Sequence, residues 1–85
     1  MGYEMGIVYS STAVTSATGE VNTNHHTSCI HFLNTHASTN AVVKLNGGPH
    51  KVLIPAGKNY VEVEGDYTKF EVETAGVTLA VYAVG

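Results

Sequence analysis

All histidines of this chain except His50 fall between His25 and His36, and the single cysteine, Cys29, lies among them. Imidazole nitrogen and thiolate sulfur are the usual protein ligands of zinc, and structural zinc sites take four of them, generally as two close pairs. Cys29 and His31 stand two residues apart, so in a β-strand both side chains point to the same face. They form one workable pair of ligands.

The sequence provides no second close pair. The other histidines lie in segments that we expect to be loops or turns: His25, His26, His36 and His50. A symmetric oligomer could complete a metal site by repeating Cys29 or His31 around its axis. The simpler interpretation is that the histidines are polar surface residues and Cys29 is a small core residue. We therefore predict no metal site and no cofactor, and metal binding stays the open alternative.

Cys29 is also the one candidate thiol nucleophile, because a thiol beside a histidine can be activated. The sequence identifies no orienting Asp and no oxyanion hole, and no positive side chain adjacent to Cys29 would lower the pKa of its thiol. The glutamates of the C-terminal half alternate with apolar residues, as on the wet face of a strand: Glu62, Glu64, Glu71 and Glu73. We predict that the protein has no catalytic residues and is not an enzyme.

The elements that position these side chains read as strands separated by turns rich in Gly, Pro and Asn. Residues 59–64 and 69–74 each carry apolar side chains on one face only. Gly65-Asp66 between them is a plausible tight turn, so the two segments predict an antiparallel hairpin. Residues 40–54 predict a second hairpin around Asn46-Gly47-Gly48-Pro49, whose residue types tolerate positive φ and end a ladder.

The segment 77–84 differs because both of its faces are largely apolar. Val77, Leu79 and Val81 share one face, which we predict to lie in the core. The other face carries the candidate interface residues: Ala80, Tyr82 and Val84. Such a strand is either central and covered on both sides, or it faces a partner subunit. Its position near the C-terminal end favours an edge strand and hence the partner.

The N-terminal half is less regular. Residues 3–9 predict a short strand, and residues 27–35 predict a strand with Ile30 and Phe32 on one face. Residues 10–24 consist mainly of Ser, Thr, Ala, Asn and Gly, a composition that builds no core by itself. We expect a flexible loop there, or an arm that orders on a neighbouring subunit, because a structureless loop of this length usually has a function.

These patterns predict a single all-β domain over residues 1–85, a small antiparallel β-sandwich or barrel of about six to seven strands. One cysteine excludes an internal disulfide, so we expect the small domain to gain stability as a homo-oligomer, a dimer or trimer. Charged residues make up 13% of the chain and the net charge is −3, which argues against binding nucleic acid or an anionic membrane. From the sequence we expect no transmembrane segment and no signal peptide.

Four features occur together: the Ser/Thr/Ala-rich N-terminal stretch, the Val-Lys-Leu-Asn-Gly hairpin, the Ile-Pro-Ala-Gly turn and the closing Val-Thr-Leu-Ala-Val-Tyr-Ala-Val strand. In this combination the chain resembles the small all-β virion proteins of tailed bacteriophages, of the capsid decoration (cement) or head and tail accessory type. The resemblance implies a non-enzymatic virion protein, made in the host cytoplasm, that binds and stabilises an assembled shell. Its partners would be copies of itself and a major capsid or tail protein.

A competing function is a small ligand-binding module, for carbohydrate or metal. Carbohydrate modules usually present Trp or Tyr platforms, but this chain has no Trp and its tyrosines are spread along the sequence: Tyr3, Tyr9, Tyr60, Tyr67 and Tyr82. Residues 48–60 also resemble the second cupin motif at Pro55-Ala56-Gly57. Pro49 replaces the expected Asp and Tyr60 replaces the metal-binding His, so we interpret this resemblance as a shared turn geometry.

Overall fold

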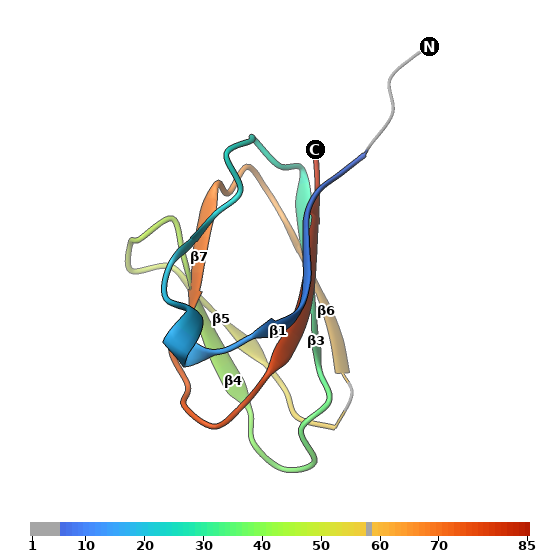
Figure 1. Ribbon diagram of the computed structural model, residues 1–85, viewed down its shortest axis with the longest axis vertical. Helices are drawn as coiled ribbons and strands as arrows, with labels where there is room; N and C mark the ends of the chain where they lie inside the picture. The colour runs from blue at the N-terminus through green and yellow to red at the C-terminus, as the bar shows by residue number, and fades with distance from the viewer. Residues whose placement is uncertain (1–5, 58) are drawn as a thin grey trace.

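The computed structural model describes residues 6–57 and 59–85, and within these ranges the chain forms eight strands in two four-stranded antiparallel sheets (Figure 1). The elements are β1 (Ile7–Val14), the 3-10 turn η1 (Ser16–Thr18), β2 (Val21–Asn22), β3 (Cys29–Asn34), β4 (Ala41–Leu45), β5 (Lys51–Ile54), β6 (Asn59–Glu64), β7 (Lys69–Val72) and β8 (Leu79–Val84). The predicted all-β class is confirmed, with the two-residue β2 as an unexpected strand. No helix in the described ranges is long and apolar enough to cross a membrane.

The strands pair in a nested order. β1 pairs with β8, β2 with β7, β3 with β6 and β4 with β5, and every pair is antiparallel. Two further pairs, β3 with β8 and β4 with β7, join these into sheets of order β1-β8-β3-β6 and β2-β7-β4-β5. The chain is therefore one long antiparallel ribbon folded over on itself, which is the connectivity of an eight-stranded jelly roll.

The two sheets face each other (Figure 1). The buried apolar residues of the core come from both sheets. Phe32 of β3 and Phe70 of β7 are fully buried, and their rings meet edge to face at 5.7 Å between centroids. Tyr9 of β1 contacts the same Phe70 ring at 5.6 Å, also edge to face. Such aromatic pairs add to the stabilisation from burial alone. These contacts tie the two sheets together at the centre of the molecule.

The hairpin predicted over residues 40–54 is confirmed. β4 and β5 pair antiparallel, with Ala41 opposite Ile54. In the connecting turn Asn46 and Gly47 have φ values of 53° and 66°, the left-handed region that Gly and Asn adopt most readily. The residue types of this turn therefore predicted its backbone correctly.

The hairpin predicted from residues 59–64 and 69–74 is wrong. β6 pairs with β3 in one sheet, whereas β7 pairs with β4 and β2 in the other. The faces were predicted correctly, because Phe70 and Val72 are buried and Val61 packs against the core. Alternation with period two assigns a strand a face, but it does not select the strand beside it. The short connection between β6 and β7 crosses from one sheet to the other.

The segment 10–24 differs from the expected loop. Its first part completes β1 and pairs with β8, ending with Val14 opposite Leu79. Thr15 then caps η1 through a capping box, and β2 joins the second sheet. Val14 and Val21, the two sizeable apolar residues of this segment, are both buried. The segment thus belongs to both sheets, and its flexibility and its docking on a neighbouring subunit stay predictions. Residues 3–5 of the strand predicted over 3–9 lie outside the described residues.

β8 is a central strand, flanked by β1 and β3, so the expectation of an edge position is wrong. The cause is β1, which folds back along β8 and covers what would have been its free edge. Val77, Leu79 and Val81 are buried, as predicted. The opposite face of the segment carries the candidate interface residues, which are half-buried: Ala80, Tyr82 and Val84.

Candidate functional site

The sheet β1-β8-β3-β6 has one face on the core and one face directed away from it, which we call the outer face. Directly opposed residues form three rows across it. The rows are Ile7, Val84, Cys29 and Glu64; Ser10, Tyr82, His31 and Glu62; and Ala80, Leu33 and Tyr60. All three candidate interface residues therefore lie on the outer face. Its middle is apolar and aromatic, and its β6 edge is acidic.

Three rings in the second and third rows form a stack, which we call the aromatic cluster (Tyr60, His31, Tyr82). The His31 ring lies 4.3 Å from the Tyr82 ring at 15° and 5.3 Å from the Tyr60 ring at 27°. The Tyr60 hydroxyl contacts His31 Nδ1 and lies 2.9 Å from the Tyr82 hydroxyl. The hydrogen bond with Tyr82 is the largest of the effects that raise the pKa of Tyr60 to about 12.

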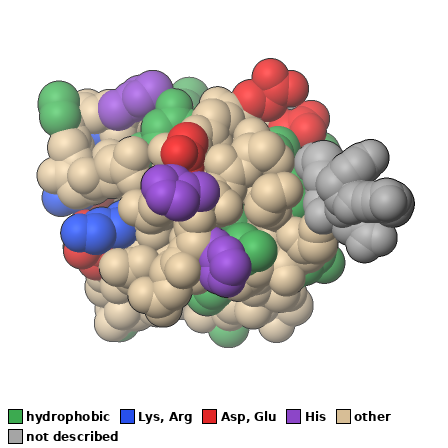
Figure 2. All heavy atoms as spheres, turned by 90° about the horizontal axis from the view of Figure 1, so that it is seen from above, with side chains coloured by type: hydrophobic (Ala, Val, Ile, Leu, Met, Phe, Trp, Pro, Cys, Tyr) green, Lys and Arg blue, Asp and Glu red, His purple; other side chains and the backbone are tan. Residues whose placement is uncertain are grey.

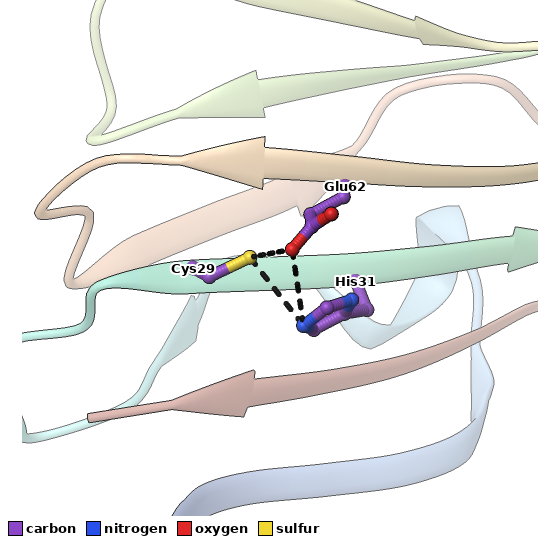
Figure 3. Close-up of side chains that lie close together, drawn as sticks. All are labelled: Cys29, His31 and Glu62. Carbon is purple, nitrogen blue, oxygen red and sulfur yellow. Dashed lines mark hydrogen bonds and ion pairs between the residues drawn. The ribbon is translucent and has the colours of Figure 1, made fainter. Parts of the chain in front are cut away.

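A second group, the Cys29–His31–Glu62 cluster, shares His31 with the aromatic cluster (Figure 3). Cys29 and His31 come from β3 and Glu62 from the neighbouring β6, directly opposite His31. The Cys29 thiol donates a hydrogen bond to Glu62 Oε2 at 3.2 Å, and Cys29 Sγ lies 3.4 Å from His31 Nε2. His31 Nε2 and Glu62 Oε2 are 4.0 Å apart.

The Cys29 thiol is poorly suited to nucleophilic catalysis in this environment. The pKa of the thiol is raised to about 11, first by burial and then by the hydrogen bond to Glu62 and the charges of Glu62 and Glu64. A thiol with this pKa is almost wholly protonated near neutral pH, whereas the thiolate is the nucleophile. The geometry therefore offers a protonated donor and, if the proton is displaced, a sulfur ligand.

A small pocket of about 160 Å³ opens beside the aromatic cluster. Its walls include residues of β1, β8, β3 and β6: Ser10, Thr12, Ala80, Tyr82, Leu33 and Tyr60. Pockets that enclose a drug-sized ligand generally measure about 300–1,000 Å³. This pocket has room for one protruding side chain or a comparably small group.

Most of the sequence cluster of histidines is dispersed in space. His26 Nδ1 and Asp66 Oδ2 form a surface hydrogen bond of 2.8 Å, and His36 Nδ1 accepts from the backbone N–H groups of Ser38 and Thr39. Figure 2 shows histidine side chains lying apart from one another over one end of the molecule. Among the histidines that the structure describes, only His31 joins Cys29 in a group of potential metal ligands.

The glutamates are likewise divided between the two sheets. Glu62 and Glu64 lie on β6, whereas Glu71 belongs to β7 and pairs with Lys44 at 3.5 Å. Glu73, just beyond β7, pairs with Lys51 at 3.0 Å. These four glutamates therefore lie in separate places and do not form one group.

Sequence reasoning found two members of the Cys29–His31–Glu62 cluster and missed the third. Alternation in the sequence predicts Glu62 on the wet face of a hairpin with residues 69–74, whereas the structure places it directly opposite His31. Tyr60 and Tyr82 stand far apart in the sequence, and only the pairing of β3 with both β6 and β8 brings them together. No short-range pattern contains that information.

Comparisons with protein-family models, with curated proteins and with solved structures found no match to this chain.

Proposed function

We propose that this chain is a non-enzymatic structural protein of a bacteriophage virion, of the capsid decoration type, which associates with copies of itself and stabilises an assembled shell. The observation that carries the proposal is the nested pairing of eight strands, because jelly rolls build viral capsid domains. Lectins and cupins share this fold, so the fold alone does not select a function. The residues exposed on the outer face distinguish between these functions.

The outer face supports the proposal. Tyr60 and Ile7 are 54% and 63% exposed on it, beside the half-buried candidate interface residues Ala80, Tyr82 and Val84. Aromatic and apolar residues are enriched at the centres of protein interfaces, and charged residues are depleted there. The pocket beside the aromatic cluster has the size for one anchoring side chain of a neighbouring protein. We assign this face to the contact with a second copy.

The proposal includes the finer architecture and the location. We take the two sheets as a β-sandwich rather than a barrel, because in the described ranges no strand pair joins one sheet to the other. The chain is made in the host cytoplasm and resides in the virion, as a dimer or trimer on a major capsid or tail protein. Nucleic acid and membrane are not among its partners, in keeping with the net charge of −3.

Binding to shells tests the proposal. Purified protein is mixed with capsid shells of the encoding phage that were assembled without it, and the bound fraction is measured after sedimentation. Wild-type protein should sediment with the shells. Tyr82→Ser, which weakens the contact between copies, should bind more weakly because fewer linked copies engage the shell at once. Leu53→Ser is the matched control, because Leu53 is an apolar residue of the other sheet with 55% exposure. A wild-type protein that stays in the supernatant would reject the shell partner.

A second candidate, a carbohydrate-binding module, is favoured by one specific observation. Tyr60 and Tyr82, which are distant in the sequence, form with His31 an aromatic surface beside a pocket. Lectin domains also use the jelly roll. Binding of the purified protein to immobilised glycans, lost in Tyr60→Ala, would support this candidate over the virion role, and a uniformly negative glycan array would remove it.

A further inference from the structure

The Cys29–His31–Glu62 cluster is a group of three different metal-ligand types on one rigid surface. Each residue offers one ligand atom, and the three atoms lie within 4.8 Å of one another. Cys29 is buried, the His31 side chain is 12% exposed and the Glu62 side chain is 50% exposed. The open side of the group is therefore at Glu62.

The spacing of the three atoms suits tetrahedral zinc. Bonds of about 2.3 Å to sulfur and about 2.0–2.2 Å to nitrogen and oxygen place neighbouring ligands about 3.3–3.6 Å apart. The measured separations are 3.4 Å from Cys29 Sγ to His31 Nε2, 3.2 Å from Cys29 Sγ to Glu62 Oε2 and 4.0 Å from His31 Nε2 to Glu62 Oε2. A small rotation of the half-exposed Glu62 side chain shortens the distance between His31 Nε2 and Glu62 Oε2 to this range.

The other nitrogen of His31 is held in the way that metal-binding histidines require. His31 Nδ1 contacts the Tyr60 hydroxyl, which is itself hydrogen-bonded to the Tyr82 hydroxyl. Metal-binding histidines usually donate the N–H of the other ring nitrogen to a hydrogen-bond acceptor, and that bond fixes the ring orientation and the tautomer. The Tyr60 hydroxyl can serve as this acceptor. The stacking of the His31 ring on Tyr82 restricts the same rotation. His31 therefore presents Nε2 to Cys29 and Glu62 without a large rearrangement.

The backbone also holds the ligands in place. His31 and Glu62 are directly opposed in the β3–β6 ladder, and Cys29 lies two residues before His31 on the same face of β3. β3 is paired on both sides, with β6 and with β8. A site on paired strands is more rigid than a site on loops, so the order of the ligand atoms is built into the sheet.

We propose that Cys29 Sγ, His31 Nε2 and Glu62 Oε2 bind a zinc ion on the outer face, with the fourth position open on the side of Glu62. Sulfur and imidazole ligands select zinc-like cations over magnesium and calcium, which prefer oxygen. Binding displaces the thiol proton, which passes to the solvent. Three protein ligands and one open position are the arrangement in which zinc keeps a water or takes a ligand from another molecule.

Metal titration of the full chain tests the site. Chelator-treated protein is titrated with Zn²⁺ in the presence of a chromophoric chelator, and separately with Co²⁺ while its absorption is recorded. We expect one Zn²⁺ per chain, a thiolate-to-cobalt charge-transfer band in the near ultraviolet and visible bands of tetrahedral Co²⁺. Mg²⁺ should neither bind nor raise the thermal midpoint, whereas Zn²⁺ should raise it.

Matched variants locate the ion. Cys29→Ser should abolish the charge-transfer band, and Glu62→Gln should weaken Zn²⁺ binding. Tyr60→Phe should also weaken it, by about tenfold, because it removes the partner of His31 Nδ1. Glu71→Gln is the control: Glu71 lies on β7 of the other sheet, pairs with Lys44 and is not one of the three ligands. Circular dichroism checks that each variant folds.

Two results would overturn the proposal. One is a wild-type protein that binds no stoichiometric Zn²⁺ or shows no sulfur-to-cobalt band, which needs no variant to fold. The other is that both single variants, Glu62→Gln and Cys29→Ser, bind Zn²⁺ with the same affinity as the wild type, which would place the ion elsewhere. The site is independent of the virion role, because a monomer that does not bind shells can still bind zinc.

Discussion

Replacing Leu79 with alanine tests whether β8 lies inside the sheet β1-β8-β3-β6 with Leu79 facing the core. Leu79 is fully buried and lies between Val14 of β1 and Asn34 of β3. The substitution removes three side-chain carbons, worth roughly 2.4 kcal/mol of transfer free energy at about 0.8 kcal/mol each. The cavity left behind adds to this cost, so we expect a loss of about 3–5 kcal/mol in the free energy of unfolding.

The same substitution at Leu53 is the matched control. Leu53 lies on β5 of the other sheet and is 55% exposed, so less than half of its side-chain surface leaves water on folding. Leu53→Ala should therefore cost about 1 kcal/mol or less, with no cavity. The loss in the free energy of unfolding should therefore be at least about three times larger for Leu79→Ala than for Leu53→Ala.

Urea denaturation followed by far-ultraviolet circular dichroism measures both losses, since the chain has no tryptophan. All proteins are compared at one concentration, because self-association would add to the apparent stability. The total stability of a domain of this size is roughly 4–13 kcal/mol, so Leu79→Ala could unfold it outright. Leu79→Val, which removes less volume, then takes its place. Equal costs at Leu79 and Leu53 would refute the burial pattern of the two sheets.

Three further predictions concern polar groups. Asn34→Leu should lower the free energy of unfolding by at least about 2 kcal/mol in urea, because the buried amide donates to two backbone carbonyls and accepts from one N–H group. In metal-free protein the Cys29 thiol, with its pKa raised to about 11, should react slowly with a disulfide reagent at pH 8, and it should react faster in Glu62→Gln. Because folding favours the protonated thiol, its contribution to the free energy of unfolding is present below about pH 9 and is lost as the pH rises through 11. Cys29→Ala should abolish this loss of stability. Tyr82→Phe should lower the pKa of Tyr60, read by NMR titration of the tyrosine ring; an unchanged value would show that the hydroxyl contact is absent.

The faces of the strands could be read from the sequence, because a strand alternates its side chains with period two. Val77, Leu79 and Val81 were assigned to the core and Tyr82 to the opposite face, and the structure agrees. Turn chemistry likewise predicted the β4–β5 hairpin. Both signals are local, and each acts over a few residues.

The partners of the strands could not be read in the same way. The β6–β7 connection looks like a hairpin turn, yet it crosses between sheets, because the choice of neighbour depends on the whole nested order. Asn34 falls within the strand predicted over residues 27–35, but its polar side chain does not reveal that it is fully buried with its amide hydrogen-bonded. For the same reason the candidate site could be predicted only in part. Cys29 and His31 are close in sequence, whereas Glu62 reaches them only through the pairing of β3 with β6.

Hydroxyl-radical footprinting of the protein across a dilution series tests most directly whether the outer face is the contact between copies. Tyr60 on the outer face and Leu53 on the other sheet have nearly equal exposure in the single chain, at 54% and 55%. As the protein concentration rises, oxidation of Tyr60 should fall while oxidation of Leu53 stays constant, and in Tyr82→Ser the protection of Tyr60 should require higher concentration. Oxidation of Tyr60 that is the same at every concentration, or protection that appears at Leu53 instead, would contradict the assignment of the outer face as the interface.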